Sequence, residues 1–395
     1  MGLIRLHWKP RRGALAGALA VLAVVIPKGA VTPQSVVAPL TASVPAPTGP
    51  NRIGTFTLRI VDSKRIDPYL GAGTKREVLV RFWYPVLAGV PCQPAEYMSP
   101  RVWAYLSELV NIRLPDIRTN SCWNAPIAGG GHAVIVLTHS YTGTFTDYTF
   151  IAEDLASRGY VVASIAHTYE TTAVEFPDGR LAKSMVGSYL APESLSFDEA
   201  SLSLARSVRL DDLKFILDEL ARLNSDTDSP FVGQLDLSRV GLVGHSLGGE
   251  AAISGVEHDA RFKAAVIIDG VVTNASAVGT DKAVLILAAG REQWSDNECA
   301  LWRHLRGFRF AVNLIGADHM TPSDAVWLAA YVPGLAVQTG PTGPQRTMAA
   351  VRNYVATFLD ANLRGQPMNS LLTGPSPDSP EVVATTREQL LCGKP

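Results

Sequence analysis

The chain has 395 residues, of which 47% are hydrophobic, and its 35 basic and 36 acidic side chains give a formal net charge of −1. This length and composition allow a large buried core. The balanced charge excludes the strongly basic footprint that nucleic-acid binding requires, so we expect no nucleic-acid partner.

The first thirty residues have the pattern of an export signal. Four basic residues between Arg5 and Arg12 precede an uncharged run from Gly13 to Ile26. This run is short for a membrane-spanning helix, which needs about 20 apolar residues, and is typical of a signal peptide. We therefore expect residues 1–30 to be a signal peptide and the protein to be secreted or periplasmic. An uncleaved N-terminal anchor and a buried core helix are the alternatives, because Lys28 stands where a cleavage site favours a small residue.

The four cysteines, Cys92, Cys122, Cys299 and Cys392, form no C-x-x-C pair, and no histidine pair has zinc-finger spacing, so we expect no metal site. In an exported protein, an even number of cysteines favours disulfides. Three pairings are possible, and proximity along the chain favours Cys92–Cys122 with Cys299–Cys392. Four buried free thiols are the alternative, which a cytosolic location would favour.

Residues 31–52 are rich in proline and have no periodicity, which predicts a linker. The folded part is therefore expected to start near Ile53. Two strands are predicted next, over residues 56–61 and 77–84, and Pro85 ends the second.

Buried strands and helices alternate from about residue 133 onward. Apolar runs predict strands, and helical periodicity predicts helices around them, over residues 133–137, 148–158, 160–165, 210–220, 240–243, 264–268, 283–287, 310–315 and 347–363. This alternation indicates an α/β fold with a mostly parallel central sheet flanked by helices, whose active site lies at the carboxyl ends of the strands. We expect a catalytic domain over residues 53–365 and a loop-like tail over 366–395. Residues 171–199 break the alternation and are either a lid or pocket rim or a plain surface loop.

The sequence Gly244-His245-Ser246-Leu247-Gly248 fits the G-x-S-x-G motif, between a buried strand and a helical segment. A sharp strand–helix turn strains the serine backbone, and Gly244 and Gly248 flank it because side chains there would collide. The turn exposes the Ser246 hydroxyl, and the amide of Leu247 at the helix N-terminus can donate to an oxyanion. Ser246 is the predicted nucleophile; a glycine-rich turn with an incidental serine is the alternative.

A serine nucleophile needs a base, and the chain order in this fold is serine, acid, histidine. His319 follows the strand that ends at residue 315, whereas His304 lies in a predicted helix, so His319 is the predicted base. Asp269 ends another predicted strand and is the favoured acid. Asp296 is the alternative acid. Asp318 directly precedes His319 and is expected to point away from it.

The second oxyanion donor is expected in the loop that follows the strand at residues 133–137. The backbone amide of Tyr141 is the candidate. His139 in the same loop is expected to fix the loop by hydrogen bonds, and a pocket residue is the alternative role.

Several further motifs occur in the same order, and together they resemble the platelet-activating factor acetylhydrolase family. The resemblance is to the plasma-type, lipoprotein-associated phospholipase A2 branch, over roughly residues 56–332. Asp269 follows Ser246 by 23 residues, as the acid of that family does. The other segments that carry the resemblance are Arg81-Phe82-Trp83-Tyr84-Pro85, Thr138-His139, residues 154–163, Gly244-His245-Ser246-Leu247-Gly248-Gly249, and His319 with Ser323-Asp324.

The resemblance implies an α/β-hydrolase fold and calcium-independent hydrolysis of short or oxidised acyl esters, including the sn-2 ester of phospholipids, as in a 1-alkyl-2-acetylglycerophosphocholine esterase. It also implies that the oxyanion amides are those of Tyr141 and Leu247. The family has His-Gly where this chain has His139-Ser140.

We therefore expect a carboxylic ester hydrolase that works through an acyl-enzyme and needs no cofactor. The expected partner is a small-molecule or lipid ester, with contact to a membrane surface. Acyl transfer and polyester or amide hydrolysis use the same three residues and are alternatives. A non-catalytic binding protein on a hydrolase fold is the alternative from another class.

Overall fold

The computed structural model describes residues 41–71, 73–270, 279–291, 294–332, 335, 337–374, 382–386 and 392. The predicted signal peptide or anchor at residues 1–30 lies outside this part of the chain. Among the residues described, no helix combines the length and the apolar character needed to cross a membrane.

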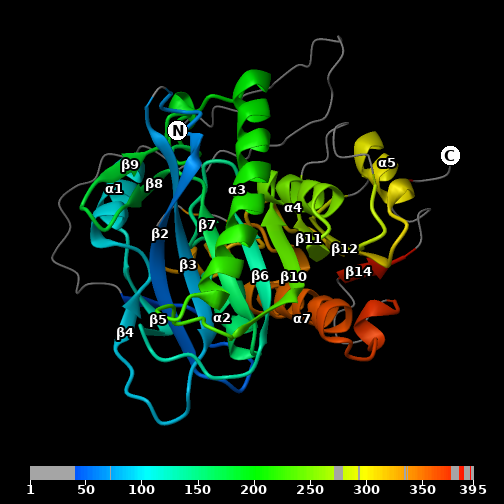
Figure 1. The fold of residues 1–395 in the computed structure, drawn as a ribbon. Helices are drawn as coiled ribbons and strands as arrows, with labels where there is room; N and C mark the ends of the chain where they lie inside the picture. Colours follow the sequence, from blue (N-terminus) through cyan, green and yellow to red (C-terminus); the bar gives the residue numbers. More distant parts are fainter. Residues whose placement is uncertain are drawn as a thin grey trace.

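A 12-stranded sheet runs through the described part of the molecule, in the order β1-β5-β2-β3-β7-β6-β10-β11-β12-β13-β14, with β4 paired to β5. Six neighbouring strands from β7 to β13 are parallel, and the antiparallel strands β3 and β14 flank them (Figure 1). The strands are β1 (Thr41–Ser43), β2 (Ile53–Ile66), β3 (Lys75–Pro85), β4 (Pro94–Glu96), β5 (Asp116–Trp123), β6 (His132–Thr138), β7 (Val161–Ala166), β10 (Leu235–His245), β11 (Phe262–Ile268), β12 (Ala283–Ala289), β13 (Arg309–Leu314) and β14 (Val382–Thr385). A separate hairpin pairs β8 (Ala173–Glu175) with β9 (Leu181–Lys183).

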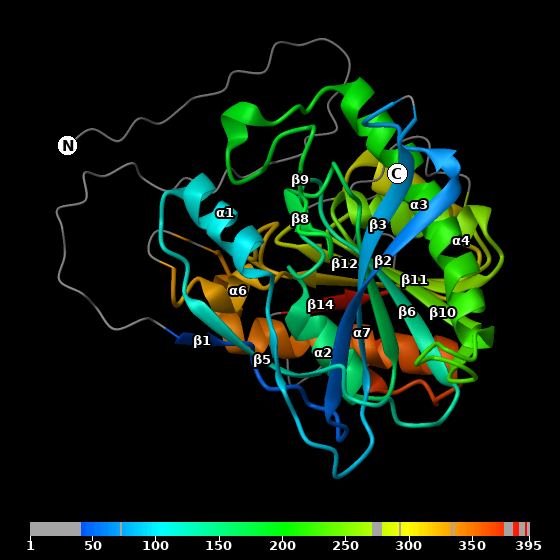
Figure 2. The same ribbon diagram turned by 60° about the vertical axis from the view of Figure 1, so that its left-hand side comes forward.

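Helices cover both faces of this sheet, as Figures 1 and 2 show. One face packs against α2 (Thr149–Ser157) and α7 (Pro344–Arg364), and the other against α3 (Glu199–Ser225), α4 (Leu247–His258) and α5 (Asp296–His304). The remaining helical segments are α1 (Pro100–Val110), α6 (Ala325–Leu328), η1 (Pro192–Ser194), η3 (Gly340–Thr342) and η4 (Ser370–Leu372).

The central parallel strands are apolar along their whole length because helices cover both of their faces. Every residue of β7 and of β12 is buried. The expected α/β architecture, with a mostly parallel sheet between helices, is confirmed.

Capping residues and prolines define several helix ends. The Ser99 side chain accepts a hydrogen bond from the Val102 amide where α1 begins, and Ser295 and Glu298 form a capping box at α5. In α7, a proline occupies the first turn and Gly365 ends the helix in a left-handed conformation.

The edges of the sheet differ from the sequence expectations. β1 lies within the range expected to be a linker and pairs with β5, so folded structure begins before Ile53. At the other edge β14, within the expected loop-like tail, pairs with β13. β4, β5 and α1 were not predicted from the sequence either. In β1 and β4 a single buried residue lies between two exposed ones, and the first half of β5 alternates between exposed and partly buried residues, so these strands lack the long apolar runs that mark the central strands.

Two disulfides join the cysteines, Cys92 to Cys122 and Cys299 to Cys392. This is the pairing that proximity along the chain favoured, so that prediction is confirmed, and the alternative of four free thiols is wrong. The second disulfide ties the end of the C-terminal tail to α5, on the face that carries α3 and α4.

Replacement of both Cys299 and Cys392 by serine should lower the free energy of unfolding more than replacement of both Cys92 and Cys122. In the loop-entropy treatment, a bond that spans 93 residues contributes about 4.7 kcal/mol to the free energy of unfolding, and one that spans 30 contributes about 3.7 kcal/mol. Urea unfolding of the two double variants measures the difference. A larger loss for the Cys92–Cys122 pair would contradict the entropic account.

Candidate active site

A sharp turn between β10 and α4 carries Ser246. The serine has φ 57° and ψ −121°, a conformation that non-glycine residues rarely adopt. A Cβ atom added at Gly244 would lie within 3.0 Å of the Gly248 backbone, and one at Gly248 within 3.0 Å of the carbonyl oxygen of Thr138. Both glycines are therefore required by close backbone contacts, as the motif predicted.

Asp269 and His319 are hydrogen-bonded to each other. The His319 Nδ1 lies 2.6 Å from one carboxylate oxygen of Asp269, at the end of β11. The other oxygen accepts from the Ala289 amide at 3.0 Å and from the Arg291 Nε at 2.9 Å. Burial alone would raise the pKa of Asp269, but the hydrogen bond from His319 and the charge of Arg291 lower it below the ordinary value of 3.8. The carboxylate is therefore ionised at neutral pH, and the ring is left with Nε2 for chemistry.

The other sequence candidates lie elsewhere. Asp296 is exposed in the first turn of α5, and His304 is exposed in its last turn. Asp318 accepts hydrogen bonds from the amides of Met320 and Gln338, so it shapes the turn beside His319. Of the two candidate acids, the structure brings only Asp269 to His319.

Ser246 lies beside this acid–base pair. Its amide donates to the carbonyl of Ile268, the residue before Asp269, at 2.9 Å. The ring of the preceding His245 lies 4.5 Å from the ring of His319, centroid to centroid. The turn that carries Ser246, the carboxylate of Asp269 and the loop that carries His319 therefore meet at the carboxyl ends of β10, β11 and β13, where the fold rule predicts a site.

Tyr141 and Leu247, the predicted oxyanion residues, belong to one buried apolar cluster. Among the hydrogen bonds of the described residues, neither backbone amide donates to a protein acceptor. The left-handed position of this loop is Thr142, with φ 54°, and Ser140 is not among the positive-φ residues. The serine in place of the family's glycine at position 140 therefore needs no special backbone freedom.

A fully buried ion pair between Arg209 and Glu170 fixes the loop that carries Tyr141. Arg209 of α3 donates to the carbonyls of His139 at 2.6 Å and of Ser140 at 3.1 Å, and its guanidinium pairs with Glu170 at 2.5 Å. The Glu170 carboxylate also accepts from the Thr142 amide at 3.3 Å. Arg209, Glu170 and Arg291 were not predicted from the sequence. For Arg209 alone the sequence holds a signal, which is a charged residue on the otherwise apolar face of α3.

His139 is buried within this arrangement. Its Nδ1 lies 2.7 Å from the Ser140 carbonyl, and its Nε2 accepts from the His167 amide at 3.3 Å. Burial and the nearby Arg209 charge lower its pKa well below the ordinary value, so the ring is neutral. These contacts favour the structural role expected for His139.

Residues 171–199, left open as a rim or a surface loop, lie against the loop of Tyr141. The Tyr141 hydroxyl donates to the Ser196 carbonyl at 3.0 Å, and the Tyr189 amide donates to the Thr142 hydroxyl at 3.0 Å. Val186 packs in the same cluster as Tyr141 and Leu247. The segment therefore packs on this loop, and its role as a lid or pocket rim stays a prediction.

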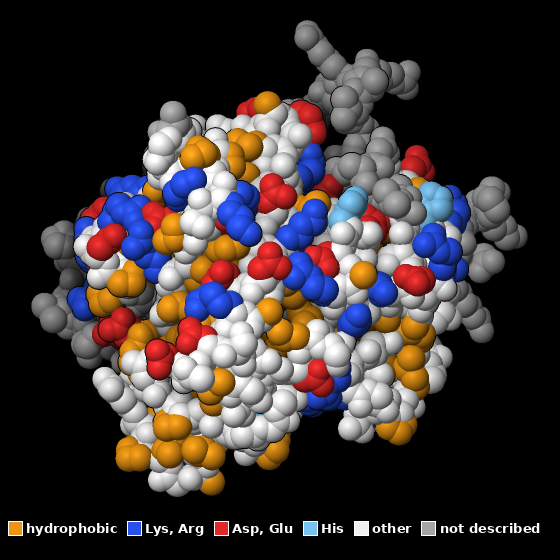
Figure 3. Space-filling model, in the orientation of Figure 1, with side chains coloured by type: hydrophobic (Ala, Val, Ile, Leu, Met, Phe, Trp, Pro, Cys, Tyr) orange, Lys and Arg blue, Asp and Glu red, His pale blue; other side chains and the backbone are white. Residues whose placement is uncertain are grey.

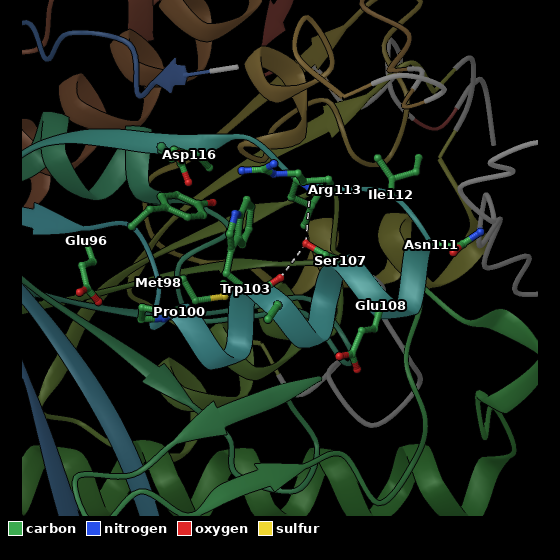
Figure 4. Close-up of a pocket in the computed structure, with 14 residues that line it drawn as sticks. Glu96, Met98, Pro100, Trp103, Ser107, Glu108, Asn111, Ile112, Arg113 and Asp116 are labelled. Atoms are coloured by element: carbon green, nitrogen blue, oxygen red, sulfur yellow. Dashed lines mark hydrogen bonds between the residues drawn. The ribbon is translucent and has the colours of Figure 1, made fainter. Parts of the chain in front are cut away.

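A cavity of about 770 Å³ follows α1 and the chain that leads into β5 (Figure 4). Trp103 rises from α1 toward Arg113 and Asp116, whereas Glu108 points away from them. None of the predicted site residues lines it. Tyr97 lines this cavity, and its hydroxyl donates at 2.8 Å to Asp324, which follows His319 by five residues in the loop that carries it.

On the face shown in Figure 3, basic and acidic side chains are interspersed, as the net charge of −1 suggests.

Comparison with known families identifies the protein class. Residues 62–185 and 201–305, more than half of the chain, match the family described as platelet-activating factor acetylhydrolase, isoform II. The chain belongs to this family. A probable 1-alkyl-2-acetylglycerophosphocholine esterase of Arthroderma benhamiae is 27% identical over 278 residues, which cover 65% of this chain and 67% of that one. The platelet-activating factor acetylhydrolase of Cavia porcellus is 28% identical over 185 residues, 42% of this chain and 41% of that one. The chain thus matches about two fifths of this second relative's length.

A solved structure covers more of the chain. The ferulic acid esterase from Streptomyces cinnamoneus is 32% identical, with a TM-score of 0.71, over 87% of this chain and 99% of that one. The acetylhydrolase-family chain therefore has the α/β-hydrolase fold. By family, it is a carboxylic ester hydrolase.

Gly248→Ala should damage this site because the new methyl group would meet the carbonyl oxygens of Thr138 and His139. Overpacking of this kind typically costs about 1–3 kcal/mol. We expect lower esterase activity and a lower urea midpoint. Gly129→Ala is the control, since a Cβ there would meet only Gln234 at 3.8 Å. Equal behaviour of the two variants would contradict the role of the close contact.

Asp269→Asn should reduce kcat by about 10³- to 10⁴-fold, because the amide no longer stabilises a charged imidazole. It should also remove a pH-dependent stability term. The lowered pKa of Asp269 means that its carboxylate stabilises the fold above pH 3.8, and that this stabilisation is lost as the pH falls through the folded-state pKa. In urea unfolding, the stability difference between wild type and variant should be larger at pH 7 than at about pH 3. The exposed Asp296→Asn is the control, and a pH-independent difference would contradict the expectation.

Proposed function

We propose that the protein hydrolyses carboxylic esters with Ser246 as nucleophile, His319 as base and Asp269 as the acid that orients it. The hydrogen bond of 2.6 Å between His319 Nδ1 and Asp269 carries the proposal. It supports a base whose free Nε2 can accept the serine proton. The strained turn at Ser246, which is only 5% exposed and lies beside the end of β11, supports a nucleophile held in the same place.

In the proposed reaction, Ser246 Oγ attacks the acyl carbonyl carbon while His319 Nε2 takes the hydroxyl proton. The amides of Tyr141 and Leu247 donate to the oxyanion that forms. As the intermediate collapses, His319 returns the proton to the leaving alcohol, and an acyl-enzyme remains. Water then attacks the acyl carbon with His319 again as base. The bond from that carbon to Ser246 Oγ breaks, His319 returns the proton to Oγ, and the carboxylic acid leaves. Asp269 stays ionised throughout and stabilises the imidazolium.

For the acyl group, we propose short or oxidised chains, as in the sn-2 ester of phospholipids. The relatives named acetylhydrolase and 1-alkyl-2-acetylglycerophosphocholine esterase support this class. A feruloyl ester is a second candidate, because the ferulic acid esterase structure matches nearly the whole chain at higher identity. Contact with a membrane surface stays a prediction.

For location, we propose that the protein works outside the reducing cytosol. The two disulfides among the described residues support an oxidising compartment. We also propose that residues 53–365 carry the reaction, with β1 and β14 closing the edges of the sheet.

Ser246→Ala tests the nucleophile. We expect turnover of p-nitrophenyl acetate to fall by on the order of 10⁴- to 10⁶-fold while the circular dichroism spectrum stays unchanged. Ser254→Ala, farther along the same helix α4, is the matched control and should keep wild-type turnover. Unchanged turnover by the Ser246 variant would rule out the proposed reaction.

A panel of acetyl, butyryl, longer acyl and oxidised acyl phospholipid esters, with methyl ferulate, separates the two substrate candidates. Highest kcat/KM on the short or oxidised acyl esters would support the phospholipid class. Preference for methyl ferulate would replace it with the second candidate.

A further inference from the structure

A buried chain of hydrogen bonds outside the three proposed catalytic residues joins the loops on which they depend. The Ser140 amide lies 3.3 Å from the Tyr148 hydroxyl, which lies 2.6 Å from His245 Nδ1. His245 Nε2 lies 2.8 Å from the carbonyl oxygen of His319. Tyr148 and His245 are 2% and 1% exposed, so water does not compete for these contacts.

The direction of each hydrogen bond follows from the groups themselves. A carbonyl oxygen can only accept, so His245 Nε2 carries a proton and donates to His319. Burial, and secondarily the neighbouring His319, lowers the pKa of His245 to about 3, so the ring is neutral and its Nδ1 has a free lone pair. The Tyr148 hydroxyl therefore donates to Nδ1, and its oxygen accepts from the Ser140 amide. Each group in the series therefore donates to the next, from the Ser140 amide in the loop that carries Tyr141 to the carbonyl of His319.

The chain connects three parts of the proposed site. Ser140 immediately precedes Tyr141, whose amide is the proposed oxyanion donor. His245 immediately precedes Ser246, and its ring lies against the ring of His319. Tyr148 therefore fixes the distance between the oxyanion loop, the nucleophile turn and the backbone of the base.

A second contact holds the same junction. Tyr148 directly precedes α2, and the first two amides of that helix donate to the carboxylate of Asp324, both at 3.1 Å. Asp324 lies five residues after His319, and its own amide donates to the carbonyl of Asp147 at 2.7 Å. The histidine loop is therefore attached to the start of α2 on both sides of Tyr148, which leaves the tyrosine hydroxyl little freedom to move.

We propose that Tyr148 is a positioning residue for the ester hydrolysis, acting through His245 on the backbone of His319 and through Ser140 on the oxyanion loop. This inference rests on the proposed function. It assigns to the histidine of the G-x-S-x-G motif a role as the middle of a hydrogen-bonded link.

Tyr148→Phe removes the hydroxyl and keeps the ring. Displacement of catalytic groups by about 1 Å can cost about 100-fold, so we expect kcat for p-nitrophenyl acetate to fall by about 10- to 100-fold. KM should change by less than about threefold, because Tyr148 and His245 are buried and present almost no surface to a substrate.

Tyr160→Phe is the matched control. Tyr160 is also a fully buried tyrosine, and its hydroxyl donates to Asp360 at 2.7 Å, away from the site. Tyr148→Phe deletes two hydrogen bonds and Tyr160→Phe deletes one, in each case at a fully buried ring, so a general loss of stability would appear in both variants. We expect Tyr160→Phe to retain the wild-type kcat, and an equal loss of kcat in both variants would overturn the inference.

His245→Gln tests the same link at its middle and replaces the first test if Tyr148→Phe does not fold. The glutamine amide can still donate to the His319 carbonyl but offers no acceptor at the Nδ1 position. We expect it to lower kcat, and the Tyr148→Phe/His245→Gln double variant to be no slower than His245→Gln alone. Multiplying effects would show that the two side chains act independently and would overturn the link.

Two readouts separate this inference from the function on which it rests. The ¹⁵N resonance of His245 Nδ1 should shift in Tyr148→Phe and stay in place in Tyr160→Phe. A fluorophosphonate should label Ser246 in wild type and label it about 10- to 100-fold more slowly in Tyr148→Phe. Equally fast labelling in the variant overturns the inference and leaves the function standing, whereas no labelling of Ser246 in wild type overturns both.

Discussion

The close contact between the first turn of α4 and the end of β6 is the constraint on which the candidate site depends. Gly248 passes so near the carbonyl oxygens of Thr138 and His139 that no side chain fits there. This backbone contact sets the turn at Ser246 against the loop that carries Tyr141, and the side-chain contacts add to it. The left-handed conformation of Ser246 is the strained result, and it persists because packed neighbours on both sides of the turn hold it.

Buried charges then fix the loop that this contact brings close. Arg209 and Glu170 are both fully buried, and a second buried group joins Asp212 to Arg76 and His167. An ion pair of this kind adds little stability over apolar packing, but loss of one partner leaves an unpaired charge and costs about 3–5 kcal/mol. We interpret these pairs as specifying where the oxyanion loop lies. The same reasoning explains why a 27-residue helix that packs on the sheet carries arginine and aspartate on its buried face.

The family of the chain and the roles of its site residues rest on different observations. The family match ends at residue 305, before His319 and before the elements that close the end of the sheet. The assignment of the base therefore depends on its contact with Asp269 and on the ring of His245. For this reason the ester class follows from the family, whereas the residues that do the chemistry are proposals from geometry.

The sequence by itself determined the α/β architecture and the glycine-flanked turn at Ser246, because continuous apolar runs and a five-residue glycine motif are local signals. It favoured one of three disulfide pairings, and the structure confirmed that pairing. It gave His319 and two candidate acids from their places at strand ends. Only the tertiary structure showed that Asp269, and not Asp296, is hydrogen-bonded to His319, revealed the contacts of Arg209 and Tyr148, and added the edge strands β1 and β14. The physical reason is that local patterns record backbone conformation and burial, whereas the meeting of side chains tens of residues apart depends on the order of strands in the folded sheet.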